Sequence, residues 1–157
     1  MALCASKSEL SNWPFSPWAK TLMAQHIELD FEIGAVNSLL NTNSCNLIQL
    51  DVKLKKLTKA VLTHLELEAQ FLVPMLTETK ALSQQRNYLN EGFDALFKIC
   101  RATTDYVHSL KLSFGNCSVT DSQSERIIYF LDEIKNRLND EDFIYSQMTE
   151  KGNEDEI

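Results

Sequence analysis

Apolar residues recur along the chain at alternating steps of three and four, the spacing of one face of an α-helix. Four such segments predict helices over about 18–40, 47–76, 78–114 and 124–149. The third is long enough to allow a break near 101–105. Ser122 followed by Glu125 fits a capping box at the start of the fourth. The pattern predicts an all-α fold, an antiparallel up-down-up-down four-helix bundle.

The domain boundaries follow from the same pattern. The bundle is expected to occupy residues 18–149 as one domain, which this chain length can supply with a core. Pro14 and Pro17 disfavour helix, so residues 1–17 are predicted to form an extended N-terminal arm that packs on the domain through its aromatic side chains. Residues 150–157 form an acidic tail.

Polar residues interrupt the apolar faces of the predicted helices. In the second helix, His64 and Glu68 stand in one row with leucines, and Phe71 and Met75 continue that row. In the first helix, His26 occupies the same kind of position. Burying such groups costs free energy unless a proton, a partner or a metal compensates. We therefore expect these residues to share a buried site.

The expected heights of these residues bring them together. With a rise of about 1.5 Å per residue and alternating helix direction, His26, His64 and Glu68 fall near one end of the bundle. Glu141 of the fourth helix and Gln85 of the third reach the same level. The residues expected to line the pocket around them are Asp30, Gln85, Arg137 and Tyr145. A metal site, a structural polar cluster and a small-molecule pocket all remain open on this evidence.

Composition narrows the classes of function. The net charge of −7 argues against a nucleic-acid-binding surface, which needs basic residues to neutralise phosphates. It is compatible with a basic regulatory protein partner, although acidic charge is common in soluble proteins. No apolar stretch approaches the roughly 20 residues of a membrane span. The four Cys are scattered without metal-binding spacing, and reduced thiols in the cytoplasm are the simplest interpretation.

The second predicted helix resembles the metal-binding helix of hemerythrin-like (HHE cation-binding) domains. That family has a His, a Glu four residues later and an apolar run closed by Pro, as in His64, Glu68 and residues 72–74 here. The phrase QHIELD is similar to the family's first His-containing phrase and places His26 at that His. In the fourth helix, RLNDEDFIYSQM is similar to the family's closing phrase, with Glu141, Asp142 and Tyr145 as the matching residues.

The resemblance spans about residues 18–148 and implies a non-catalytic binding or sensing domain. Its ligand would be iron or another transition metal, held by His26, His64, Glu68 and Glu141. The family's di-iron site takes more His ligands than the three His of this chain. We therefore expect a degenerate site, mononuclear or without metal, rather than an O₂-carrying di-iron centre. Arg137 could pair with Glu141 or Glu68 and take the role of a missing cation.

A second resemblance is to the regulator-of-sigma-D family of anti-sigma proteins. It rests on residues 63–76 and 139–144 and implies a metal-free regulator that binds the basic surface of a transcription factor. The sequence has no Ser/His/Asp set and no phosphate-binding Gly loop, so we do not expect an enzyme. Two alternatives are carried forward: a hemerythrin-like binding domain, and a metal-free protein-interaction regulator.

Overall fold

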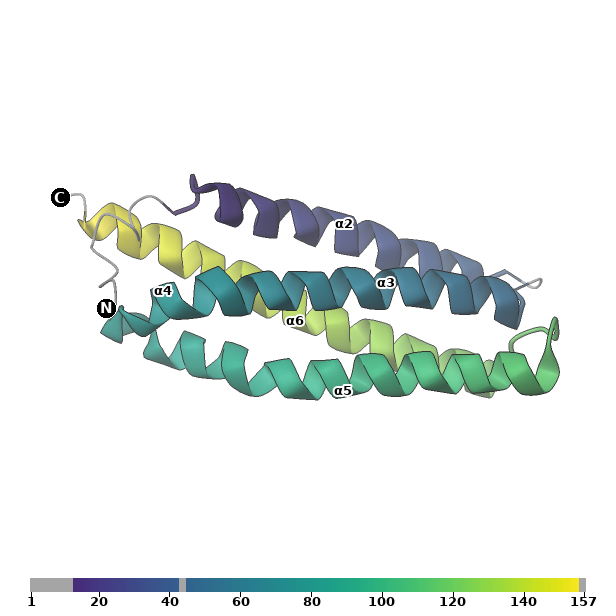
Figure 1. Ribbon diagram of the computed structural model, residues 1–157. Helices are drawn as coiled ribbons and strands as arrows, with labels where there is room; N and C mark the ends of the chain where they lie inside the picture. Colours follow the sequence, from purple (N-terminus) through teal and green to yellow (C-terminus); the bar gives the residue numbers. More distant parts are fainter. Residues whose placement is uncertain (1–12, 43–44, 156–157) are drawn as a thin grey trace.

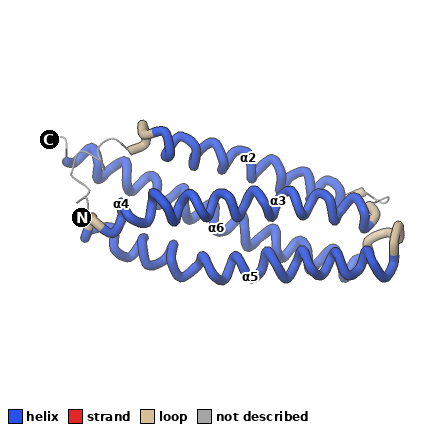
Figure 2. Tube along the Cα trace, viewed as in Figure 1, coloured by secondary structure: helices blue, strands red, loops and turns tan. Residues whose placement is uncertain are grey.

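The computed structural model describes residues 13–42 and 45–155, and these residues are almost entirely helical (Figure 1). Four long segments lie side by side, and short loops join neighbouring ends, so consecutive segments run in opposite directions (Figures 1 and 2). The long helices are α2 (Pro17–Leu40), α3 (Leu47–Leu67), α5 (Ser83–Phe114) and α6 (Asp121–Asp155). The all-α class predicted from the sequence is confirmed, and α5 continues unbroken through 101–105.

Local chemistry explains where the first helices begin. Pro17 opens α2, a position at which proline loses no intrahelical hydrogen bond. Asn46 caps α3, because its side-chain oxygen accepts a hydrogen bond from the backbone N–H of Gln49 at 2.8 Å. Asn46 also forms an isolated antiparallel bridge with Ser118, which ties the start of α3 to the loop before α6.

A π-helical turn interrupts the second helical segment directly after Leu67, one turn beyond His64. The π segment η1 (Glu68–Leu72) is followed by α4 (Val73–Thr77) and the 3₁₀ turn η2 (Lys80–Leu82). The wider turn changes which side chains face inward, so Leu72 is buried. Phe71 is partly exposed and stacks on Trp18 with ring centroids 5.8 Å apart. The prediction that Phe71 lies on the inner face was therefore wrong.

The apolar core consists of two clusters at successive levels of the molecule. The larger includes Leu29 of α2, Leu65 of α3, Leu96 of α5 and Leu138 of α6. The smaller lies toward the chain termini and includes Leu22, Leu72, Leu89 and Ile144 from the corresponding segments. Between these levels lie the buried polar residues His26, Glu68 and Glu141, and Gly92 on α5. The core is thus divided by a layer of different chemistry.

The chain ends differ in part from the predicted boundaries. Residues 1–12 of the predicted arm lie outside the described part of the chain. Trp13 is buried and its indole N–H donates to the backbone oxygen of Tyr145 at 3.2 Å, whereas Phe15 is 72% exposed. Helix α6 runs to Asp155, beyond the predicted end at 149. Within the described residues, no helix is long and apolar enough to cross a membrane.

The N-terminus of α6 carries a capping box that lies two residues before the predicted one. The side chain of Thr120 accepts from the N–H of Gln123 at 3.2 Å, and the Gln123 side chain accepts from the N–H of Thr120 at 3.0 Å. The predicted pair, Ser122 and Glu125, instead lies inside the helix, which begins at Asp121.

Substituting Thr120, the observed cap, should therefore destabilise the protein, whereas substituting Ser122, the cap predicted from the sequence, should not. We expect Thr120→Ala to lower the free energy of unfolding by about 1 kcal/mol, because the Gln123 N–H loses its side-chain acceptor. Ser122→Ala is the matched control and should change it by less than about 0.5 kcal/mol. Urea unfolding followed by circular dichroism measures both values. Equal destabilisation by the two variants would contradict this assignment of the cap.

Candidate metal centre

Four buried polar side chains lie between the two apolar clusters. His26 comes from α2, His64 from the last turn of α3, Glu68 from the start of η1, and Glu141 from α6. His64 and Glu68 are each 2% exposed, and Glu141 is fully buried. The helical steps that predicted these residues at one level explain their convergence: each takes an inward position that leucines hold above and below.

The facing atoms of these side chains crowd around one point. His64 Nε2 lies 2.7 Å from Glu141 Oε1 and 2.7 Å from Glu68 Oε1. His26 Nε2 lies 3.0 Å from the same Glu141 oxygen and 3.2 Å from His64 Nε2. A single proton on His64 Nε2 cannot satisfy all of these atoms with good geometry. Glu68 Oε1 accordingly has no hydrogen-bond partner despite its proximity to His64.

Two further side chains orient the imidazoles. Asp142 Oδ1 lies 2.8 Å from His26 Nδ1, and Gln25 Oε1 lies 2.8 Å from His64 Nδ1. Both oxygens are acceptors, so each Nδ1 carries a proton and donates it. In a neutral imidazole the opposite nitrogen, Nε2, then presents a lone pair. Both lone pairs point to the shared centre, as the outer hydrogen bonds of metal-binding histidines arrange.

The spacing of these atoms suits one transition-metal ion. His26 Nε2, His64 Nε2 and Glu141 Oε1 are 2.7 to 3.2 Å apart. Neighbouring ligands at right angles around an ion, with bonds of about 2.1 Å, are about 3 Å apart. Two His and one carboxylate on one side of an ion form a recognised site for Fe²⁺. The unpartnered Glu68 Oε1 offers a fourth ligand atom at the same centre.

Arg137 occupies the far side of both carboxylates. Its Nε donates to Glu141 Oε2, and its Nη2 donates to Glu68 Oε2 at 3.1 Å. Burial lowers the pKa of the guanidinium, but the charges of Glu141 and Glu68 outweigh that effect and raise it, so Arg137 is cationic. Gly92 of α5 makes room for it, because a Cβ built there would lie 2.5 Å from Arg137 Nη1. At this level α5 therefore provides no ligand. Gly92, which has no side chain, leaves the space that the Arg137 guanidinium fills.

Protonation balances the charge in the absence of metal. Burial alone would lower the pKa of His64, but the hydrogen bond with Glu141 and the nearby charges of Glu141 and Glu68 raise it to about 9. Burial and the neighbouring charge of Glu141 raise the pKa of Glu68 to about 7. Although burial opposes it, the polar contacts of Glu141 with His26 and His64 hold its pKa well below the usual value. Protonated His64 and Arg137 thus lie against the ionised Glu141 and balance whatever charge Glu68 carries.

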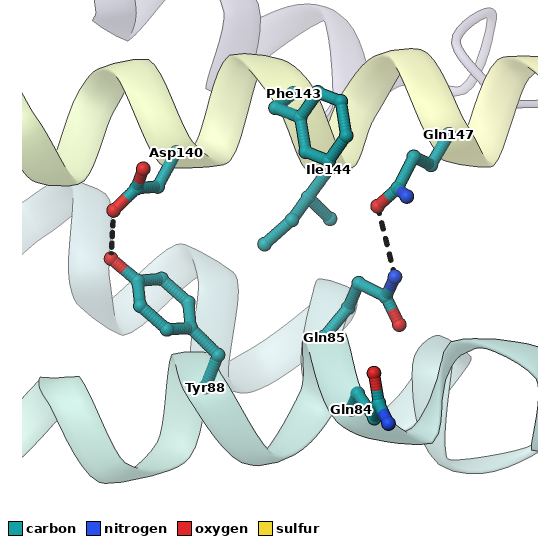
Figure 3. A pocket seen from close by; sticks show the side chains of 7 residues that line it. All are labelled: Gln84, Gln85, Tyr88, Asp140, Phe143, Ile144 and Gln147. Atoms are coloured by element: carbon teal, nitrogen blue, oxygen red, sulfur yellow. Dashed lines mark hydrogen bonds between the residues drawn. The ribbon is translucent and has the colours of Figure 1, made fainter.

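The four residues predicted to line the pocket have different surroundings. Arg137 lies within the polar layer, and Tyr145 Oη lies 3.2 Å from His26 Nε2. Asp30 is exposed and lies outside the layer. Gln85 lines a separate groove between α5 and α6, where its amide donates to Gln147 Oε1 at 2.9 Å (Figure 3). The prediction that Asp30 and Gln85 line the shared pocket was wrong.

Three contributors were not predicted as site residues. Gln25 and Asp142 each stand next to a predicted ligand in the sequence. From that neighbouring position, each side chain contacts a histidine on another helix. Gly92 is the one glycine inside the long α5 helix, where glycine is unfavourable without a packing reason. A glycine at this unfavourable position could have indicated from the sequence that a large side chain, here Arg137, packs against it.

The raised pKa of His64 predicts how stability depends on pH in the metal-free protein. A folded-state pKa above the unfolded value of 6.5 contributes stability that is complete below that value and is lost as pH rises through about 9. With chelator present, we expect the free energy of unfolding to fall between pH 7 and 9, by at most about 1.4 kcal/mol per pH unit. Denaturant titrations across this range measure it. His64→Gln should flatten the slope, and a wild-type stability that rises with pH would contradict the expectation.

Neither protein-family models nor curated proteins nor solved structures match the chain. The buried polar layer is therefore the feature from which a function is inferred.

Proposed function

We propose that this protein is a non-catalytic binding or sensing domain that holds one transition-metal ion in its polar layer. The observation that carries the proposal is the convergence of two imidazole lone pairs and the Glu141 carboxylate at distances of 2.7 to 3.2 Å. The ligands would be His26, His64 and Glu141, with Glu68 as the fourth. We further propose a hemerythrin-like up-down-up-down bundle, since the ligands come from three of four alternating segments.

The donor set favours Fe²⁺ or Zn²⁺. Imidazole nitrogen and carboxylate oxygen suit both ions, and three or four protein ligands are sufficient. Arg137 argues for one ion and not two, because its guanidinium holds the outer oxygens of Glu68 and Glu141. A second cation beside those oxygens would lie against a fixed positive charge. A bridged di-iron centre is therefore not proposed.

A bound ion would replace the proton that otherwise holds the layer together. His64 must be neutral to bind a metal, so binding at pH 7 would release its proton. Asp142 and Gln25 keep the two Nδ1 atoms protonated, so the Nε2 atoms stay available as ligands. The residues of this chain thus prepare the site in the absence of the ion.

Metal analysis tests the proposal directly. Protein purified without a His tag and reconstituted anaerobically with Fe²⁺ should retain about one equivalent after desalting, since all ligands are preorganised. The double variant His26→Ala/His64→Ala should retain none, whereas His108→Ala, outside the site, should behave as wild type. Elemental analysis by mass spectrometry gives the stoichiometry. Retention below about a tenth of an equivalent of either Fe²⁺ or Zn²⁺ would refute metal binding.

The hydrogen bonds that Gln25 and Asp142 form with the two imidazoles should affect how tightly the metal binds but not how many ions bind. Gln25→Ala and Asp142→Ala should each weaken Zn²⁺ binding by about 10- to 100-fold, because an imidazole loses the acceptor that orients it. Competition with a chromophoric chelator measures the affinity. Asp30→Ala, an exposed carboxylate on the same helix as Gln25, is the control and should have no effect. Unchanged affinity in both variants would show that these contacts are not part of a metal site.

A metal-free protein-interaction regulator is the second candidate, and two observations favour it. Arg137 and protonated His64 can neutralise the buried carboxylates without any ion. In addition, Ile27 and Phe31 are 75% and 72% exposed, one turn apart on the outer side of α2. Under this proposal, His64→Leu/Glu68→Met would retain both the fold and the regulatory activity, because Arg137 and Glu141 remain paired. Loss of activity in that folded variant would exclude it.

A further inference from the structure

A row of aromatic rings leads from the polar layer toward the protein surface. It begins at two of the proposed ligands, because the rings of His64 and His26 have centroids 4.8 Å apart, and Tyr145 follows 5.0 Å from His26. Trp13 lies 5.1 Å from Tyr145, and Trp18 lies 5.5 Å from Trp13. The first four rings are buried, whereas Trp18, in the first turn of α2, is partly exposed. This aromatic row therefore connects the buried centre with solvent.

The composition of the aromatic row suits the movement of single electrons. Among aromatic side chains, those of tryptophan and tyrosine give up an electron more readily than those of phenylalanine and histidine. The sequence has only two tryptophans, and both belong to the row. Centroid separations of this size are those of aromatic pairs in contact. Electron transfer is fast between groups in contact, because it slows steeply as the gap between them widens.

The hydrogen bond of Tyr145 favours the two tryptophans as the electron donors. An oxidised phenol releases its proton, and Tyr145 Oη bonds to His26 Nε2 at 3.2 Å. A bound metal ion would take the lone pair of that nitrogen, so it would no longer be an acceptor for the phenol. An oxidised indole keeps its proton, and the Trp13 N–H already donates to the backbone oxygen of Tyr145. We therefore expect Tyr145 to connect the centre with the indoles and to remain reduced itself.

We propose that a peroxide reacting at the iron-loaded centre draws an electron from the tryptophans through the aromatic row, and that the oxidation is completed at Trp18. This inference rests on the proposed metal function and assigns peroxides to it as the class of signal. A cavity of about 160 Å³ has Glu68, the proposed fourth ligand, in its wall, and offers small neutral hydrogen peroxide an approach to the centre. A reaction at the buried ion is thus recorded on a residue near the surface.

The electrons balance with hydrogen peroxide as the only oxidant. Cleavage of its O–O bond takes up two electrons, one from Fe²⁺ and one from Trp18, and yields Fe³⁺, an indole radical cation and two hydroxide ions. The radical cation then adds water, returns one electron to Fe³⁺ and releases two protons, which neutralise the hydroxide ions. The net change is the addition of one oxygen atom to Trp18, and the remaining atoms of the peroxide leave as water.

Peptide mass spectrometry tests the proposal on the full chain after treatment with one equivalent of hydrogen peroxide in the absence of air. The Fe²⁺-loaded protein should gain oxygen at Trp18 and, to a smaller extent, at Trp13, because Trp18 has better access to water. Tyr129 is exposed and outside the aromatic row, so it should stay unmodified. The Zn²⁺-loaded protein should gain no oxygen at either tryptophan, because Zn²⁺ has no redox chemistry. Equal modification of Tyr129 and Trp18 would indicate a diffusing oxidant and would overturn the proposal.

Single substitutions test the order of the aromatic row. Trp13→Phe keeps a ring but removes the oxidisable indole between Tyr145 and Trp18, so Trp18 should then be modified no more than in the Zn²⁺-loaded protein. Trp18→Phe should leave the modification at Trp13. Phe143→Leu is the control, because it removes an exposed ring outside the row, and it should behave as wild type. Modification of Trp18 at the wild-type level in Trp13→Phe overturns the proposed route.

Iron retention and circular dichroism are measured on each variant before the peroxide is added. If Trp13→Phe does not fold or does not retain iron, Trp18→Phe decides: oxygen at Trp13 supports the proposal, and no oxygen there overturns it. Iron retained by the wild-type protein without modification of either tryptophan overturns the electron route and leaves the metal function standing. If the wild-type protein retains no iron, the metal function fails and the electron route fails with it.

Discussion

The organisation of this molecule depends on one fully buried carboxylate. Glu141 has no contact with water, so its charge is stable only if cationic groups surround it. His64 and His26 face one of its oxygens, and Arg137 binds the other. Each of these partners depends on a further residue. Gln25 orients His64, Asp142 orients His26, and Gly92 leaves room for the Arg137 guanidinium. One charge on α6 thus determines residues on every long helix.

The polar layer also restricts how the helices can align. Between the two apolar clusters, sliding one helix by a single turn would place a His or carboxylate against leucines and leave its partners unpaired. Apolar contacts alone tolerate such shifts, because one leucine can replace another. We infer that the layer contributes more to the choice of a single register than to the total free energy of folding.

The sequence was informative where a pattern is repeated and uninformative where geometry is local. Helical periodicity alone predicted the helices and placed His26, His64, Glu68 and Glu141 at one level, because those positions follow from a regular rise and rotation. It failed at Phe71, since a π turn adds a rotation that no spacing rule includes. It also misplaced Gln85, which pairs with Gln147 in the groove between α5 and α6 and precedes Gly92, the α5 residue at the level of the polar layer, by about two turns. The heights on α2, α3 and α6 were predictable, whereas the alignment of α5 and the rotation after the π turn required the packed structure.

The contact of Trp13 with Tyr145 gives the molecule a built-in optical reporter. The chain has only two tryptophans, and their rings lie 5.5 Å apart at the end of the molecule that holds the polar layer. Tyr145 bridges them to His26, with ring centroids 5.1 Å from Trp13 and 5.0 Å from His26. Indole emission responds to nearby charge and to paramagnetic ions, so the intrinsic fluorescence of this protein should report on events at its centre without any added label.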